Sequence, residues 1–301
     1  MYPTTPARRH VGVIGAGRVG AILAAALRAA GHEVVAAHGL SDASRSRAAD
    51  LLPGVPLVPV AAVVEQADLV LLTVPDDPLP GLVQGVARST GFRPGQVVAH
   101  TSGRHGVAVL APAAAQGARV LALHPAMTFT GTAVDLERLP GTRFGVTTAP
   151  DEEPLARTLV AELGGVPVPI DEADRPLYHA ALAHGANHLV TLVADAMDLL
   201  ASAGVDDPAG TLRPLLTAAL DNALSHGDAA LTGPVARGDA GTVATHLQRI
   251  GEVAPDSVEL YAALARHTAA RAVADGRLRS ADADGLLDAL ALARAPRART
   301  A

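Results

Sequence analysis

The 301-residue chain contains no cysteine, no tryptophan and no lysine. Without cysteine it can form no disulfide, no thiolate metal site and no cysteine nucleophile. Without lysine it can use neither a lysine acid nor a lysine Schiff base, and its basic side chains other than histidine are all arginines. Aromatic residues make up only 2% of the chain, which argues against a base-stacking platform for nucleic acid.

An excess of positive charge and long apolar runs are also lacking. The 24 basic and 30 acidic residues give a net charge of −6, so there is no basic footprint for nucleic acid. No apolar stretch reaches the ~20 residues that span a bilayer, and the polar, proline-containing first ten residues do not resemble a signal peptide. We therefore expect a cytoplasmic protein that binds neither nucleic acid nor membrane.

Hydrophobic residues account for 49% of the chain, enough for a sizeable core, and the length predicts two domains. Over residues 1–170 short β-type runs alternate with helical stretches such as Val19–Ala30. This alternation predicts an α/β fold with a doubly wound, mainly parallel Rossmann sheet. The predicted strands are Val11–Ile14, Glu33–Ala37, Val55–Val58, Leu69–Val74, Val97–His100, Val120–Leu123, Arg143–Thr147 and Val166–Ile170.

From Pro176 onward the sequence shows no strand pattern. The stretch Leu177–Ala203 predicts one long helix that is apolar on most faces, more than a small domain can bury. We therefore predict an all-helical domain over residues 171–301 that binds substrate and forms a homodimer. Its further predicted helices are Leu215–Ser225, Gly241–Gly251, Ser257–Ala274 and Asp282–Arg294.

The strongest local motif is the Gly-x-Gly-x-x-Gly loop after the first predicted strand. Gly15 permits a tight turn, Gly17 lets the backbone approach a pyrophosphate, and Gly20 lets the following helix pack on the strand. The helix begins at Arg18 and Val19, where free N–H groups and the positive dipole end favour phosphate. The position of the loop between strand and helix favours dinucleotide binding over a glycine-rich turn without a ligand.

The end of the second predicted strand indicates which dinucleotide is bound. NAD sites usually carry an acid there, but this strand tip has none and is followed by Ser41, Ser44, Arg45 and Arg47. Hydroxyl and guanidinium groups suit a 2′-phosphate, so we predict NADP(H). Asp42, an acid, instead favours NAD(H), unless its carboxylate only caps the next helix.

Two further strand ends are predicted to meet the cofactor and the substrate, because open α/β sheets bind ligands at the carboxyl ends of their strands. Thr73, Val74 and Pro75 are expected on the adenosine side. Ser102 and Gly103 are expected at the nicotinamide and substrate, although an ordinary strand-to-helix turn is an equal alternative. His124, fixed by the proline that follows it, is a candidate proton donor beside a bound carbonyl, with a turn-capping surface histidine as the alternative.

A polar stripe crosses the long predicted helix. His184, Asn187, His188 and Thr191 are spaced to share one helical face. We interpret the stripe as substrate binding and proton transfer, with His184 and Asn187 catalytic, and His188 and Thr191 binding substrate. A zinc pair and a solvated face are the alternatives, and the third zinc ligand is not evident. Arg237, in a loop with two neighbouring glycines, is a weaker candidate clamp for a substrate carboxylate.

These motifs resemble a family of actinobacterial proteins that join a Rossmann-like domain to a DUF2520 domain. The resemblance rests on Gly15–Gly20, Thr73–Asp76, His100–Gly103, Leu123–Phe129, Tyr178–Ala181 and Leu231–Asp239. It implies an oxidoreductase with a helical domain of the 6-phosphogluconate-dehydrogenase type, through which the family dimerises. Some relatives are thought to be ketopantoate reductases. Pyrroline-5-carboxylate reductase and prephenate dehydrogenase are more distantly similar, and the latter shares the pair His124–Pro125.

One departure bears on mechanism. Ordinary ketopantoate reductases use a lysine in the helical domain, and this chain has none. The equivalent proton donor would then be His124, His179, His184 or His188. We predict NADP(H)-dependent reduction of a small oxo- or imino-acid, with ketopantoate as one candidate, in a cleft between the domains. The alternatives are a cofactor-binding sensor or scaffold without turnover, and a metal-dependent activity of the helical domain.

Overall fold

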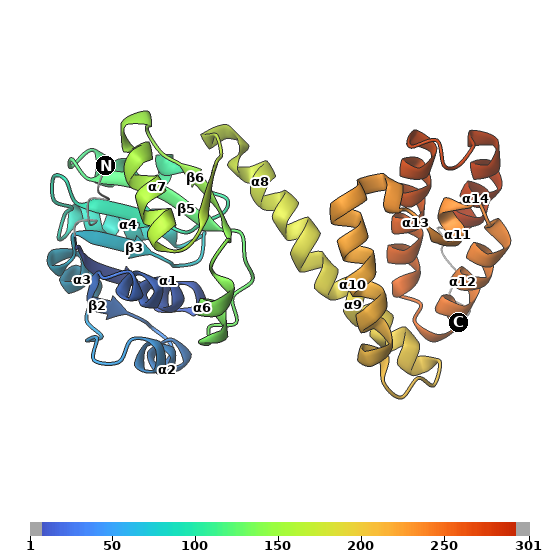
Figure 1. Cartoon of the computed structure of the whole chain (residues 1–301), viewed down its shortest axis with the longest axis horizontal. Coiled ribbons are helices and arrows are strands. Elements are labelled where there is room, and N and C mark those ends of the chain that lie inside the picture. The colour runs from blue at the N-terminus through green and yellow to red at the C-terminus, as the bar shows by residue number, and fades with distance from the viewer. Residues whose placement is uncertain (1–7, 293–301) are drawn as a thin grey trace, which may run out of the picture. The chain divides into compact units, whose positions relative to one another are not determined.

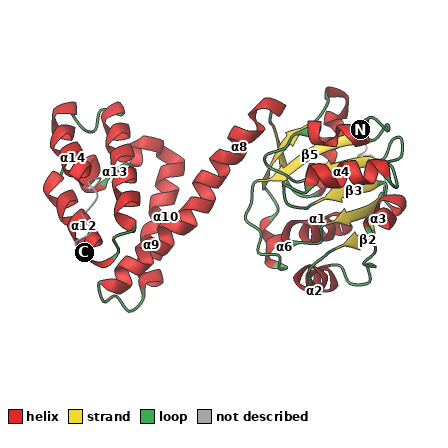
Figure 2. Ribbon diagram, turned by 180° about the vertical axis from the view of Figure 1, so that it is seen from behind, coloured by secondary structure: helices red, strands yellow, loops and turns green. Residues whose placement is uncertain are grey.

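The computed structural model describes residues 8–292. The chain divides after Gly185 into two compact units, the second beginning at Ala186. Figure 2 shows that the strands all belong to the first unit and that the second consists of helices. The predicted fold class is therefore confirmed. No helix within the described residues is long and apolar enough to cross a membrane.

The first unit is built on a seven-stranded sheet with the order β2-β1-β3-β4-β5-β6-β7 (Figure 1). Every neighbouring pair is parallel except β5 and β6. Since β2 and β3 lie on opposite sides of β1, the strand order reverses there, which is where open α/β sheets bind ligands. The strands are β1 (His10–Ile14), β2 (Glu33–His38), β3 (Leu69–Leu72), β4 (Val97–His100), β5 (Arg119–Pro125), β6 (Arg143–Thr147) and β7 (Val166–Pro169).

Helices cover both faces of this sheet, because successive strand side chains alternate between the faces. Val13 and Leu71 pack with α1 (Arg18–Ala29) and α7 (Glu153–Glu162). Ile14 and Leu72, the next residues along the same strands, pack with α3 (Val60–Gln66) and α4 (Leu79–Arg88). The central strands are buried on both sides, which explains their nearly continuous apolar sequences.

Some predicted elements differ from the structure. The predicted strand Val55–Val58 is reduced to a single parallel bridge between Leu57 and Ala37, since two prolines flank Leu57 and remove backbone donors. The segment from Val107 to Gln116, whose sequence predicts one helix, instead forms a 3-10 turn (Val107–Leu110) and a short α5 (Ala111–Ala114). The first unit also contains α2 (Asp42–Leu51) and α6 (Val134–Arg138). The sequence pattern predicts neither α3 nor α6.

The long predicted helix contains an irregular turn. It begins as α8 (Arg175–Leu182), passes through a π-helical turn over Ala183–Asn187, and continues as α9 (His188–Ser202). The division between the two compact units falls within that turn. By its contacts α8 belongs to the first unit, so it contributes side chains to the sheet edge; the predicted domain boundary at residue 171 remains a prediction.

Within the described residues, the second unit consists of α9 and five further α-helices with a small core of its own. Alanines of α13, including Ala262 and Ala269, pack against Val243 and Leu286. Small side chains at these positions allow the helices to approach closely. These five helices are α10 (Pro208–His226), α11 (Gly233–Ala236), α12 (Ala240–Val253), α13 (Ser257–Ala274) and α14 (Ser280–Leu292). The last two residues of the predicted helix Asp282–Arg294 lie outside the described residues.

Candidate functional site

The glycine loop has the geometry that dinucleotide binding requires. Gly15 adopts a φ of 103°, a conformation that favours glycine, and its N–H donates to the His38 carbonyl at 2.9 Å. A Cβ on Gly20 would collide with the Gly15 carbonyl and the Thr73 hydroxyl, whereas the space beside Gly17 is open. The first turn of α1, beginning at Arg18, therefore presents N–H groups to open space and can receive a pyrophosphate.

Thr73 supports the loop from the neighbouring strand. Its hydroxyl donates to the Gly15 carbonyl at 2.6 Å, and its N–H donates to the Ile14 carbonyl at 2.9 Å. The structure thus gives Thr73 a role in holding the glycine loop, in addition to its predicted place beside the cofactor.

After β2, Ser41, Ser44, Arg45 and Arg47 fall at the N-cap and in the first two turns of α2. Ser41 is the N-cap and accepts the Ser44 N–H at 3.1 Å. Arg45 pairs with Asp42 and donates to the Leu40 carbonyl at 2.7 Å. Arg47 and Arg18 both lie against Gly131, because a Cβ there would collide with both side chains. Asp42 therefore offsets one of the two cations expected to meet a 2′-phosphate.

The carboxyl end of β4 is held by a buried histidine. His100 accepts the Ser102 N–H on Nδ1 at 3.1 Å, and its Nε2 lies 2.8 Å from the Gly106 carbonyl. This arrangement requires the neutral ring with the proton on Nε2. Burial lowers the pKa of His100 from 6.5 to about 4. Ser102, which is buried, also accepts the His105 N–H at 3.1 Å, so it shapes the turn predicted as a ligand site.

His124, at the end of β5, meets two ring side chains from α8. Its Nδ1 lies 2.9 Å from the Tyr178 hydroxyl, and its ring packs edge-on against Tyr178 and His179 at centroid distances of 5.5 and 6.0 Å. Gly103 lies against His124 Nε2 and the His179 ring, leaving no room for a Cβ. The structure therefore brings together His124 and Gly103, two of the predicted site residues.

Arg175, at the start of α8, anchors this cluster from within the protein. Its guanidinium is fully buried and donates to the Thr147 hydroxyl at 2.7 Å and to the carbonyls of Ser102, Ala122 and Gly145 at 2.9–3.2 Å. One side chain thus joins the ends of β4, β5 and β6 to α8. Its acceptors are neutral, so a positive charge remains beside His124.

The electrostatics of the cluster follow from burial and from this cation. Burial, then the positive charges of Arg175 and His179, lower the pKa of His124 from 6.5 to about 4. Burial also raises the pKa of Tyr178, against the opposing effect of Arg175. At neutral pH the site therefore holds a neutral imidazole hydrogen-bonded to a protonated phenol. A histidine that donates a proton usually titrates near neutrality, whereas the pKa of His124 lies well below that range in this structure.

The remaining predicted residues lie elsewhere. His184 and Asn187 fall in the π turn, and His188 and Thr191 follow it; all four are exposed. A π turn changes the angular spacing, so a shared face cannot be read from α-helical periodicity here. Arg237 is exposed at the end of α11. No group of three or more His, Asp or Glu side chains suited to a metal occurs among residues 8–292.

Arg175 and Tyr178 are the site residues that sequence reasoning missed. Both lie N-terminal to the polar stripe of His184–Thr191, and an arginine followed by a proline is typical of an exposed helix start. The sequence feature that could have pointed to this site is the adjacent pair Tyr178–His179 on the helix that packs back against the sheet. Its partners at the strand ends became evident only with the three-dimensional arrangement.

Comparisons with known proteins agree with this architecture. Residues 3–125 match the model of a Rossmann-like domain, and residues 142–268 match DUF2520, a domain of unknown function. No curated protein matches the sequence. Among solved structures, a candidate NADP oxidoreductase from Bacteroides fragilis is 22% identical with a TM-score of 0.73, over 87% of this chain and 98% of that chain.

Two further structures cover nearly as much of the chain. A Thermotoga maritima protein is 21% identical with a TM-score of 0.62, over 88% of this chain and 99% of that one. An imine reductase from Myxococcus stipitatus, solved with NADP+, is 16% identical with a TM-score of 0.63, over 89% and 94%. At these identities the likeness shows a shared fold.

Proposed function

We propose that this chain, which joins a Rossmann-like domain to a DUF2520 domain, is an NADP(H)-dependent reductase of a small oxo- or imino-acid. The observation that carries the proposal is that a dinucleotide-type glycine loop and a His124–Tyr178 pair both lie at the carboxyl ends of strands of the same sheet. The loop follows β1 and the pair lies at β5, three strand positions away. At ~4.8 Å per strand this is about 14 Å, a span suited to an extended dinucleotide.

The residues present fit the cofactor. Gly15, Gly17 and the first turn of α1 would hold the pyrophosphate, while Ser41, Ser44 and Arg45 would receive a 2′-phosphate. Val74 and Pro75 would flank the adenosine, and Ser102 the nicotinamide. Bound there, the nicotinamide supplies a hydride. Solved proteins of the same fold carry NADP+ or NAD+, which supports a nicotinamide dinucleotide, and the basic residues after β2 favour the phosphorylated form.

The chain's own residues would supply the proton. Hydride addition to a carbonyl leaves an alkoxide, a far stronger base than a phenolate, so protonated Tyr178 can act as the acid. His124, neutral and 2.9 Å away, would accept the hydrogen bond of the Tyr178 hydroxyl and hold the phenol in place. The buried charge of Arg175 stabilises the anionic transition state and the phenolate that follows. His184 and Asn187 remain candidates for contacts to substrate.

The substrate class rests on charge. The guanidinium of Arg175 donates to neutral acceptors only, and its positive charge, which the carboxylates of Glu172 and Asp76 partly offset, favours a carboxylate-bearing substrate such as an oxo-acid. Ketopantoate is one acid of this class, and an imino acid is another. Arg237, His188 and Thr191 are the helical-unit residues that we propose as further substrate contacts. We also propose that the chain works as a homodimer.

A nicotinamide fluorescence titration separates this function from that of a cofactor sensor or scaffold. NADPH is added to the purified chain with and without a panel of oxo- and imino-acids. The proposed reductase binds NADPH and then loses the reduced nicotinamide signal when one of these acids is present. Tight NADPH binding with no oxidation by any member of the panel would favour the sensor.

A further inference from the structure

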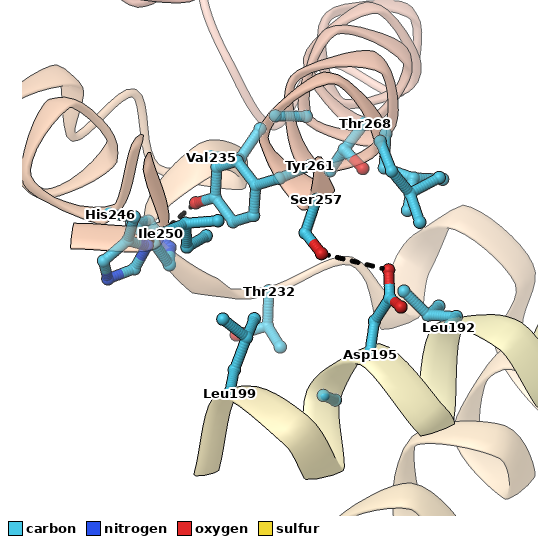
Figure 3. Close-up of a pocket in the computed structure, with 15 residues that line it drawn as sticks. Leu192, Asp195, Leu199, Thr232, Val235, His246, Ile250, Ser257, Tyr261 and Thr268 are labelled. Atoms are coloured by element: carbon cyan, nitrogen blue, oxygen red, sulfur yellow. Dashed lines mark hydrogen bonds between the residues drawn. The ribbon is translucent and has the colours of Figure 1, made fainter. Parts of the chain in front are cut away.

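All the residues that line one pocket belong to the second unit. This pocket has a volume of about 460 Å³, within the range that small-molecule sites occupy. Its walls come from α9, α12 and α13 and from the segment around α11, and they are mainly leucine, alanine, valine and isoleucine side chains. Figure 3 shows these side chains converging from the surrounding helices.

Two polar pairs interrupt the apolar wall. His246 Nδ1 lies 2.8 Å from the Tyr261 hydroxyl, and their rings meet edge-on at 5.9 Å, so these two polar atoms are hydrogen-bonded to each other. On α9, Asp195 accepts a hydrogen bond from the Ser257 hydroxyl at 3.5 Å (Figure 3). A single hydroxyl at that distance satisfies only a small part of the hydrogen-bonding capacity of a carboxylate.

The carboxylate of Asp195 therefore places a negative charge in the pocket that no arginine of the wall balances. Asp195 is the only carboxylate among the described residues that line it, and none of these is an arginine. A half-buried carboxylate in apolar surroundings favours a cation beside it, because opposite charges interact more strongly where water is excluded. His246, the one basic side chain on the described wall, already shares its Nδ1 with the Tyr261 hydroxyl, and the described wall holds no arginine that could pair with Asp195.

We propose that this pocket binds a small organic ammonium ion with an apolar body. The ammonium group would donate hydrogen bonds to the Asp195 carboxylate, and the apolar body would pack on the side chains of Leu199, Val235 and Leu264. Thr232 and Thr268, also on the wall, offer hydroxyl groups to further polar atoms of the ligand. The site consists of residues of the second unit only, so it exists whether or not the chain turns over NADP(H).

Isothermal titration of the full-length chain with benzylammonium, without nicotinamide cofactor, tests this assignment. Benzyl alcohol, which has the same shape and no charge, measures the apolar contribution alone. Benzylammonium is expected to bind saturably, and Asp195→Asn is expected to weaken it at least about tenfold, the scale of a charge-assisted hydrogen bond. Binding of benzyl alcohol should change little in this nearly isosteric variant.

Two further variants make the result decisive. Asp198→Asn, the same change one turn along α9 and outside the pocket, should leave benzylammonium binding unchanged. Ala196→Leu should fill part of the pocket and weaken both compounds. Absence of saturable benzylammonium binding to the unmodified chain would overturn the proposal, and so would equal affinities for the unmodified chain and Asp195→Asn. NADPH binding, measured separately, reports on the proposed reductase and not on this site.

Discussion

At the scale of single residues, one buried cation sets the chemistry of the sheet edge. Arg175 donates to neutral acceptors only, so its charge acts on the nearby His124 and Tyr178. Burial lowers the pKa of Arg175 itself to about 10, which still leaves it charged at neutral pH. The site thus combines a fixed positive charge with a neutral imidazole and a protonated phenol.

Tyr178→Phe tests whether the phenol is the proton donor. Removing the hydroxyl should lower turnover about 10²–10⁴-fold, the usual contribution of general acid catalysis, while NADPH affinity changes little. His124→Ala should also lower turnover, because Tyr178 loses its hydrogen-bond partner. Steady-state kinetics with an identified substrate measure both effects. His10→Ala, at the amino end of β1, is the matched control. Unchanged turnover in Tyr178→Phe would exclude it as the acid.

The two shifted histidines predict loss of stability in acid. His100 and His124 have folded-state pKa values of about 4, below the usual 6.5, so between these values the unfolded chain binds more protons. The free energy of unfolding should therefore fall as the pH is lowered from 6.5 to 4, by up to about 3 kcal/mol for each histidine. Denaturant titrations at pH 7 and pH 4.5 measure this loss. His100→Asn, which can retain part of the hydrogen bonding, should make it smaller.

At the scale of secondary-structure elements, sequence periodicity located most of the sheet because its strands are short, apolar and buried on both faces. It failed where tertiary contacts decide the structure. Leu57 has a strand-like sequence, but flanking prolines limit its pairing to one bridge. The π turn at Ala183–Asn187 leaves no mark in a run of helix-forming residues. His124 and the glycine loop were predictable from strand-end position, whereas Arg175 required knowledge of how α8 returns to the sheet.

The N-terminus of α2 carries a prediction about cofactor choice. Asp42 pairs with Arg45, so Asp42→Asn should release this guanidinium and strengthen NADPH binding, with little effect on NADH. Arg45→Ala and Arg47→Ala should weaken NADPH selectively. Fluorescence titrations with both cofactors measure the ratio of the two affinities, and Arg157→Ala, which removes an exposed arginine of α7, is the control. Equal affinity of the unmodified chain for NADPH and NADH would contradict the predicted preference.

At the scale of the whole molecule, the helical unit exposes several large apolar side chains that lie outside its own core. Val190 on α9 and Leu215 and Leu224 on α10 are 64–80% exposed. Such surface on neighbouring helices is typical of an interface, which agrees with the homodimer proposed above.

Light scattering at micromolar concentration should therefore give the mass of a dimer. Leu224→Arg should shift the equilibrium toward monomer, because a charge would be buried unpaired in the interface. Val253→Arg, an equally drastic change at an exposed position on α12, should leave the dimer intact. A monomer in the unmodified protein would count against this assembly.

The central claim is that this chain transfers a hydride from NADPH to a small oxo- or imino-acid. The most direct measurement incubates the purified chain with NADPH and ketopantoate or another acid of this class, and counts NADPH consumed by absorbance and reduced acid formed by nuclear magnetic resonance. The account predicts one molecule of reduced acid for each NADPH oxidised, with Tyr178→Phe binding NADPH normally but forming product far more slowly. Stoichiometric NADPH binding without product from any acid of the class would contradict it.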